Sequence, residues 1–426
     1  MSPWRAVWAD YAEAARRFSR PARHYLLGEL LAWTALGMFQ VLFNLFLVEQ
    51  HFQPGFIGRA VSFHGLGMAL AALPAGILAE RWGRRRTLIL GALVDGIGLA
   101  LRVMVPLPGL ILAAGLLSGS GQALLAIAAA PFLTEHSTPR ERTHLFSAFF
   151  ANSLLAGVVG SLLGGWLPGV VRLLPITPRP DAALAYRITL LFGAALALTA
   201  ATPLARLGDL KEERIESARA GVTAEDRRKL IPITLNALLI GMGAGLVIPF
   251  MNLYFATRFH CSSGQIGVLF SIASVCTAVA ALLGPAIARK FGKLRTATAS
   301  ELLSLPFLVT LGAERRLGIA AGAFWIRASL MQAAAPLLQA FVMESLPSAL
   351  RPRASSLINM VWNVGWALSA TLAGVVIEHF GYAQPFYFTA SLYLLAAATM
   401  YFSFRGTPEI GPGDPEAPLQ PEPAAE

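Results

Sequence analysis

The feature that most restricts the fold of this chain is a series of twelve long apolar segments. They cover residues 25–48, 56–79, 87–105, 109–133, 145–170, 184–205, 230–256, 264–288, 294–312, 317–343, 353–378 and 383–404. A run of about 20 apolar residues is long enough to cross a bilayer as a helix. The segments lack the alternation of apolar and polar residues that marks the strands of a membrane barrel. The pattern therefore predicts an all-α membrane protein with 12 transmembrane helices.

Composition agrees with this prediction and excludes several other classes of protein. Only 14% of the residues are charged, whereas about a quarter are charged in soluble proteins. The net charge of +10 comes from basic residues in alternate loops, so we expect a lipid bilayer and no nucleic acid as partner. The sequence contains no phosphate-binding loop, metal-binding cluster or nucleophile motif. We expect a monomer that is not an enzyme and needs no cofactor or metal.

Basic residues also predict the topology. The connections on one side of the segments, together with both ends of the chain, carry 25 of them, and the other side carries 7. Because Lys and Arg are retained in cytoplasmic loops, we expect both termini in the cytoplasm and the chain in the cytoplasmic (inner) membrane.

The charged and apolar stretches divide the chain into five parts. Residues 1–24 repeat aromatic residues at helical spacing between arginines, which predicts an amphipathic helix in the cytoplasmic interface; a solvated leader is the alternative. Residues 25–205 and 230–405 form two bundles of six helices each. Residues 206–229 form a cytoplasmic linker, and the Pro- and Glu-rich residues 406–426 a disordered tail.

The two halves are internal repeats. A shift of 209 residues superposes identical residues without gaps. The matches include His51 with His260, Gly58 with Gly267, Ser62 with Ser271, Gly83 with Gly292 and Gly165 with Gly374. Parallel repeats of this kind are typical of transporters in which two bundles face each other across an axis along the membrane normal.

One connection carries a family resemblance. Residues 76–86 read Gly-Ile-Leu-Ala-Glu-Arg-Trp-Gly-Arg-Arg-Arg. This resembles the loop between the second and third helices of the major facilitator superfamily, with Glu80 where the family usually has Asp. The resemblance implies that family's fold, with 12 helices in two pseudo-symmetric six-helix bundles.

The resemblance also implies a conformational latch. In the family, the acid of this loop caps a helix of the opposite half and its basic residues pair with the end of helix 4. The residues expected to form the latch are Gly76, Glu80, Arg81, Gly83, Arg84, Arg85, Glu135, Arg142, Lys290, Glu344 and Arg351. In the second repeat Arg289 stands in place of the acid, so we expect Glu344 and Arg351 to hold that side. The alternative is that these charges only set the topology.

Polar side chains recur along one face of several helices. Polar groups in a span usually face a protein interior or a wet cavity, and the resemblance implies that helices 1, 4, 7 and 10 line a central path. The expected substrate-binding residues are Trp33, Gln40, Asn44, Gln122, Asn152, Asn252, Gln332, Gln339, Asn359, Asn363 and Trp366. Amides with few fixed charges predict a small uncharged or amphipathic organic substrate. The alternative is that the amides join helices.

Ionisable residues in the spans are candidates for coupling to protons, because a charge at the bilayer centre costs roughly 2.5–3.5 kcal/mol. Glu29 is the first candidate, since it shares the polar face of helix 1; the alternative is an interface residue. Asp95, Glu301 and His64 follow. Asp95 is alternatively a structural partner of Arg102, and His64 a packing residue.

Helix 5 bears on the direction of transport. Gly157, Gly160 and Gly164-Gly165 resemble the antiporter signature of drug exporters, with Ser161 where proline is expected. The sequence therefore predicts a secondary active transporter that exports an amphipathic solute in exchange for protons. The alternatives are a proton- or sodium-coupled importer of a sugar-like or lipid-like metabolite, and a sensor or scaffold that binds solute without moving it.

Overall fold

The computed structural model describes residues 18–173, 181–207, 224–347 and 350–405, and the side chains of 139–143, 224–225 and 352–353 are not described. The regular structure of these ranges is entirely helical. Twelve stretches there are long and apolar enough to cross a membrane. The sequence-based prediction of an all-α protein with twelve spans is thereby confirmed.

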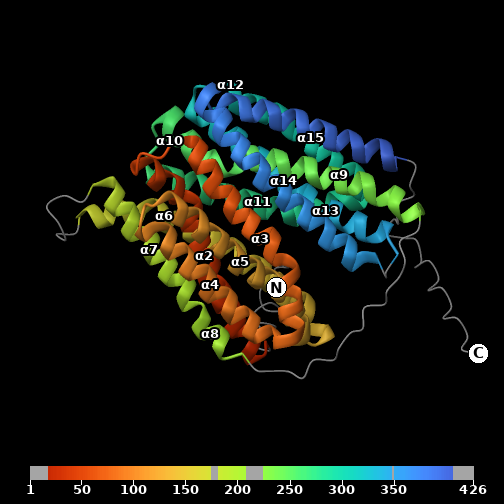
Figure 1. Ribbon diagram of the computed structural model, residues 1–426. Helices are drawn as coiled ribbons and strands as arrows, with labels where there is room; N and C mark the ends of the chain where they lie inside the picture. The colour runs from red at the N-terminus through yellow and green to blue at the C-terminus, as the bar shows by residue number, and fades with distance from the viewer. Residues whose placement is uncertain (1–17, 174–180, 208–223, 348–349, 406–426) are drawn as a thin grey trace, which may run out of the picture.

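Each half of the chain supplies six spans. The first half consists of α2 (Arg20–Glu49), α3 (Pro54–Trp82), α4 (Arg84–Met104), α5 (Pro108–Glu135), α6 (Pro139–Leu173), α7 (Ala182–Thr199) and the short α8 (Ala201–Ala205). The second half consists of α9 (Ala224–Val247), the 3-10 turn η1 (Ile248–Phe250), α10 (Met251–Phe259), α11 (Ser263–Phe291), α12 (Lys293–Ala313), α13 (Leu317–Ser345), α14 (Arg351–Phe380) and α15 (Ala383–Phe404). Figure 1 shows the helices of the two halves as two groups that lie side by side.

The first and seventh spans differ from the segments expected from the sequence. The first begins at Arg20 rather than at residue 25, because the Ser19 hydroxyl accepts from the amide of Ala22 at 3.3 Å and caps the helix. The seventh is divided at η1, where Pro249 lacks an amide hydrogen. Residues 1–17 of the expected leader, 208–223 of the expected linker and the expected tail 406–426 lie outside the described residues.

The repeat seen in the sequence is also present in the backbone. His51 and His260 both adopt a positive φ, of 62° and 53°. Gly83 and Gly292 both have a φ of 89°. A positive φ is uncommon for histidine, so its recurrence 209 residues later shows that the two halves share one local geometry at these turns.

The halves meet through two equivalent helix pairs, α3 with α14 and α6 with α11. Glycines allow the close approach: Gly58 lies against Gly374, and Gly267 against Gly165. Hydroxyls add hydrogen bonds across both pairs. The Ser62 hydroxyl donates to the carbonyl of Ala367, and that of Ser271 to the carbonyl of Val158 at 3.1 Å. We call the end of the molecule that holds these glycine contacts the closed end.

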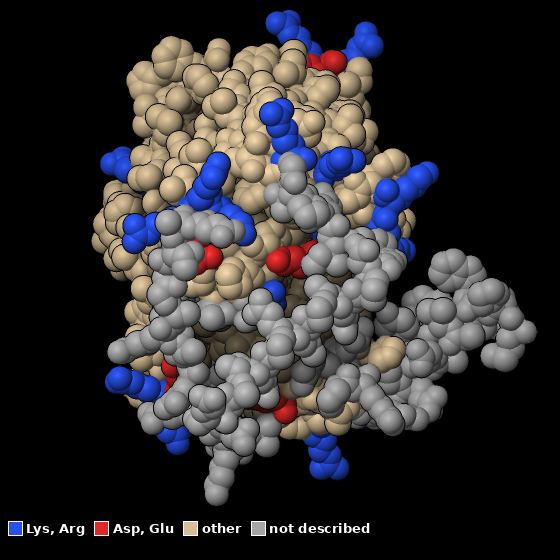
Figure 2. All heavy atoms as spheres, turned by 90° about the vertical axis from the view of Figure 1, so that its right-hand side faces the viewer, with Lys and Arg blue, Asp and Glu red and all other residues tan. Residues whose placement is uncertain are grey.

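The opposite end carries the turns at Gly83 and Gly292, and we call it the Arg-rich end. Gly58 of α3 lies against Gly374 of α14, whereas Gly76, further along α3 toward this end, has nothing within 4 Å of the place a Cβ would take. Leu70, Leu73 and Ile77 of α3 are more than half exposed. Figure 2 views this end and shows Lys and Arg around its rim, with a hollow between the halves. The halves therefore touch at the closed end and diverge toward the Arg-rich end.

Candidate functional site

A cavity of about 520 Å³ lies between the halves. Most of its lining comes from the first half, on α2, α3, α4, α5, α6 and α8. The second half contributes η1, α11 and α14. A volume of this size suits one small organic molecule.

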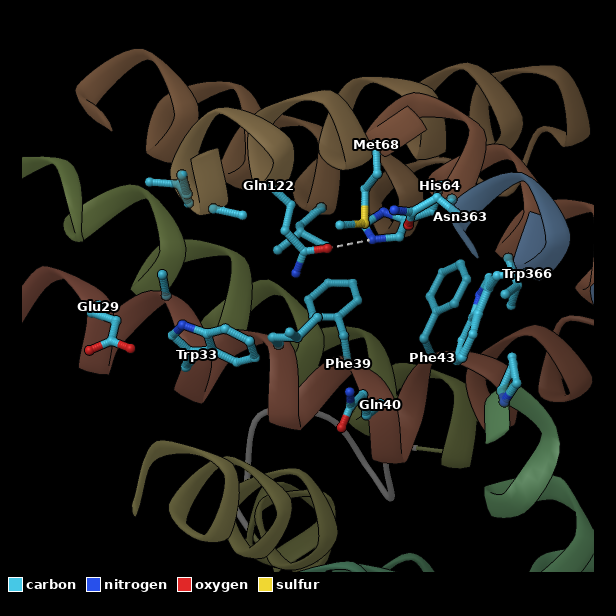
Figure 3. A pocket seen from close by; sticks show the side chains of 18 of the residues that line it. Glu29, Trp33, Phe39, Gln40, Phe43, His64, Met68, Gln122, Asn363 and Trp366 are labelled. Carbon is cyan, nitrogen blue, oxygen red and sulfur yellow. Dashed lines mark hydrogen bonds between the residues drawn. The ribbon is translucent and has the colours of Figure 1, made fainter. Parts of the chain in front are cut away.

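Helix α2 supplies the longest row of lining residues. Glu29, Trp33, Gln40 and Asn44 recur at intervals of four to seven residues, which places them along one face of the helix. Figure 3 shows Glu29 near one end of this row and Phe43 near the other. The rise from Glu29 to Asn44 is about 22 Å at 1.5 Å per residue, so the cavity is elongated.

The cavity ends toward the closed end at Asn44. Its amide donates to the carbonyl of Pro249 at 2.6 Å and to the side-chain oxygen of Asn252 at 3.2 Å. The amide of Asn252 in turn donates to the carbonyls of Gln40 and Val41, at 3.1 and 3.0 Å. Asn252 is 1% exposed and is absent from the cavity lining, so it joins the helices here.

His64 of α3 is held from both ring nitrogens by α5. Its Nδ1 lies 2.9 Å from the Ser118 hydroxyl, and its Nε2 lies 3.0 Å from the Gln122 side-chain oxygen, as Figure 3 shows for Gln122. With that oxygen as acceptor, Nε2 carries the hydrogen and Nδ1 accepts from Ser118. His64 and Gln122 thus form one fixed polar patch on the cavity wall.

Glu29 lies near the other end of the cavity and is 6% exposed. Its carboxylate accepts from the Asn152 amide at 2.8 Å and from the Ser153 hydroxyl at 2.5 Å. Among the described residues no Lys or Arg forms an ion pair with it. Asn152 does not line the cavity; the structure places it as a support for Glu29.

The other acidic candidates lie away from the cavity. Asp95 of α4 is buried against Gly121 of α5. Within the described ranges it forms no ion pair with Arg102, although the two charges interact at longer range. Glu301 of α12 is 3% exposed, and one of its carboxylate oxygens has no hydrogen-bond partner in the described part of the chain.

Several expected substrate-binding residues are not brought to the cavity. Gln332 and Gln339 of α13 are exposed, since α13 packs on α11 and α12. Asn359 of α14 is also exposed and donates to Ser355 at 3.0 Å. One turn further on, Asn363 and Trp366 do line the cavity. The part of Gln332, Gln339 and Asn359 in binding stays a prediction.

The described contacts of the first-repeat latch residues lie within the first half. Arg84 forms an ion pair with Glu135 inside the first half, and Arg85 donates to the carbonyl of Ala205 at 2.6 Å. Glu80 and Arg81 are exposed. Glu80 has no hydrogen-bond or ion-pair partner within the described ranges, and Gly76 has open space around it. Among the described residues Glu80 therefore makes no contact with the opposite half in this conformation, and its part in a latch stays a prediction.

In the second repeat Glu344 pairs with Lys293, whose helix α12 begins beside the end of α13. The expected partner Arg351 instead donates to the carbonyl of Leu346 at 3.1 Å. Lys290 lies over the ring of Phe291, 5.3 Å from its centroid. The side chain of Arg142 lies outside the described residues.

Sequence reasoning passed over the aromatic part of the lining. Phe39 and Phe43 face the cavity from α2, and Phe270 does so from α11. The i, i+4 spacing of Phe39 and Phe43 is the signal that indicates a shared face. Arg102 lines the cavity as well, and only its place inside an apolar run marked it in the sequence.

Comparison with known proteins agrees with the fold. The family model described as Major Facilitator Superfamily matches residues 25–232 and 233–426. The multidrug resistance protein MdtH of Yersinia enterocolitica is 29% identical over 151 residues, and that of Yersinia pestis 28% over 154 residues. These matches cover 33% and 34% of this chain and only 36% and 37% of the relatives' length.

Solved structures match over nearly the whole chain. A bacterial homologue of the human lysosomal transporter Spinster, in an inward-facing and occupied conformation, superposes with a TM-score of 0.75 at 15% identity, covering 90% of this chain and 96% of its own. The nucleoside transporter NupG gives 0.71 at 14% identity, with 91% and 100% covered. A D-xylose–proton symporter gives 0.67 at 18% identity, with 90% and 97% covered.

Proposed function

Because the chain belongs to the Major Facilitator Superfamily, and so is a multi-pass transporter of the inner membrane, we propose that it exports small amphipathic organic solutes in exchange for protons. The two halves rock about the cavity, which opens to one side of the membrane at a time. The Arg-rich end faces the cytoplasm in this proposal, as the excess of basic residues there indicates.

The lining of the cavity is the observation that carries the proposed substrate class. Aromatic rings of Trp33, Phe39, Phe43 and Trp366 surround an elongated space, and polar contacts are few. Aromatic surfaces bind apolar bodies of varied shape, while a few fixed polar groups orient the ligand. An amphipathic molecule matches both parts of this lining.

Proton coupling is assigned to Glu29. It is a carboxylate within a membrane span, close to the solute cavity, and its partners Asn152 and Ser153 are neutral. A buried carboxylate without a cationic partner is costly when ionised. Binding a proton or releasing it therefore changes the free energy of each conformation of the transporter.

Export is favoured by the similarity to MdtH, which is named a multidrug resistance protein. Import is the second candidate function. Two of the structural neighbours, a nucleoside transporter and a D-xylose–proton symporter, share the fold. In addition, Ser161 replaces the proline of the exporter-like signature on α6 and is buried there.

The test is a flux measurement in proteoliposomes with an imposed pH gradient. The solutes are fluorescent amphiphiles with anionic, neutral and cationic head groups. Their uptake is recorded once with the pH gradient directed inward and once with it directed outward. Exchange with protons predicts that solute moves opposite to the proton flow, and an ionophore abolishes the movement. Movement together with protons supports the importer, and binding without flux under any gradient supports the sensor.

A further inference from the structure

Arg102 is a buried guanidinium at the cavity that the proposed mechanism does not use. It lies in the last turn of α4, is 5% exposed and lines the cavity. Side chains of a helix tilt toward its N-terminus. Arg102 therefore reaches back from the closed end toward the middle of the span, where its Cζ lies 3.9 Å from the centroid of the Phe43 ring.

The guanidinium has no anionic partner at ion-pair distance among the described residues. Its Nε atom is buried without a hydrogen bond. Arginine stays protonated in proteins and carries five N–H donors, so contact with the face of Phe43 satisfies part of its charge and none of its donors. A buried charge with few hydrogen bonds is costly, and a ligand that supplies acceptors to the terminal nitrogens at the cavity lowers this cost.

None of the charged or titratable neighbours of Arg102 supplies its guanidinium with an acceptor at ion-pair distance among the described residues. Asp95 lies on the same helix, two turns away, and interacts with the guanidinium only at longer range. His64 of α3 also interacts with it electrostatically, but both ring nitrogens are taken by Ser118 and Gln122. Glu29 lies near the opposite end of the elongated cavity.

We propose that Arg102 is the docking site for an anionic head group, a carboxylate or a phosphate, of the amphipathic solute whose binding the proposed function assumes. The head group accepts from the guanidinium beside Phe43, and the apolar body lies along the aromatic rings toward Trp33. A guanidinium binds such anions with two parallel hydrogen bonds, which fixes the orientation of the ligand.

The test compares three probes with one body and different head groups: phenylhexanoate, phenylhexanol and phenylhexylamine. Binding to the full chain in discs of zwitterionic lipid is measured by calorimetry, and empty discs account for partition into lipid. We expect phenylhexanoate to bind about tenfold or more tightly than phenylhexanol, the ratio for one charge-assisted hydrogen-bonded pair. Phenylhexylamine binds more weakly than either.

Two variants test whether the preference for phenylhexanoate over phenylhexanol depends on Arg102. Arg102→Gln loses the preference for the carboxylate and keeps the affinity for phenylhexanol, while Arg102→Lys retains part of the preference. Arg327→Gln is the matched control. Arg327 is 3% exposed, is absent from the cavity lining and donates to the Tyr393 hydroxyl at 3.1 Å, so its replacement leaves the ratio unchanged.

The outcomes separate this inference from the proposed function. If none of the probes binds the wild-type chain, the amphipathic substrate class fails and the inference with it. If the probes bind without a preference for the carboxylate, or if Arg102→Gln keeps that preference, only the inference is overturned. Should Arg102→Gln bind no phenylhexanol, Arg102→Lys decides: a carboxylate preference smaller than that of the wild type supports the inference, and a preference equal to that of the wild type contradicts it.

Discussion

Asn44 of α2 and Asn252 of α10 each donate to the backbone of the other's span. Asn44 reaches the carbonyl of Pro249 at 2.6 Å, and Asn252 reaches those of Gln40 and Val41 at 3.1 and 3.0 Å. The two asparagines meet beside the 3-10 turn that contains Pro249. This reciprocal pair joins the two halves and closes the cavity on the side of the closed end.

Replacing Asn44 by alanine removes both of its donated bonds. Interhelical hydrogen bonds in membranes contribute about 0.6 kcal/mol each on average, so we expect the loss of two of them to raise the population open at the closed end by up to about tenfold. Thiol labelling of a cysteine placed at Ser62, which is buried between α3 and α14 in this conformation, measures this. Asn236→Ala is the control, because Asn236 bonds to Ala396 inside the second half. Equal labelling in the two variants contradicts the role of Asn44.

Glu29→Gln retains the side chain's size and removes its proton-binding carboxylate. We expect transport of solute to become independent of the pH gradient, while exchange of solute for solute continues. Flux in proteoliposomes at two gradients measures the change. Glu49→Gln, at the other end of α2 and exposed, is the control and keeps its pH dependence. A Glu29→Gln variant with wild-type coupling rejects Glu29 as the proton site.

Glu80→Ala tests the latch, which the present conformation leaves open. A carboxylate at a helix N-terminus stabilises it by about 0.3–1 kcal/mol, so its loss favours opening of the Arg-rich end a few-fold. We expect faster labelling of a cysteine at Asn359. Glu314→Ala, at the closed end, leaves labelling unchanged. The same rate in wild type and Glu80→Ala shows that these charges only set topology.

Gly374→Ala tests the glycine contact at the closed end. A Cβ there would lie 3.1 Å from the Cα atoms of both Gly55 and Gly58, and backbone cannot move aside cheaply. Overpacking costs about 1–3 kcal/mol, so we expect α3 and α14 to separate at this end. Spin labels on the two helices measure the distance. Gly318→Ala has open space and serves as control; an equal distance in both variants contradicts the prediction.

The sequence alone was sufficient for the architecture, and the reasons are physical. The length of the spans and the charge of the loops are set by the bilayer, and the 209-residue repeat is set by duplication of one half. His51 and His260, for example, share an unusual φ because their surroundings were copied. The polar face of α2 could likewise be predicted from the sequence, since helical spacing places Glu29 and Asn44 on one side.

Other parts of the site depend on how the helices pack, which spacing does not reveal. Asn252 is buried and hydrogen-bonds to α2 because α10 lies against that helix. Asn152 donates to Glu29 because α6 packs on α2 there. Arg102 lies in the cavity through its reach past Phe43. Gln332 and Gln339 are absent from the cavity lining, and α13, which carries them, packs on α11 and α12.

Alternation between the two ends is the central claim, and two distances on one pair of helices test it most directly. Spin labels at Gln53 and His379 report the closed end of α3 and α14, and labels at Ile77 and Asn359 report the Arg-rich end, in a chain without native cysteines. We predict that the amphiphile and a change of pH move the two distances in opposite directions. Two distances that stay fixed, or that grow and shrink together, contradict alternating access.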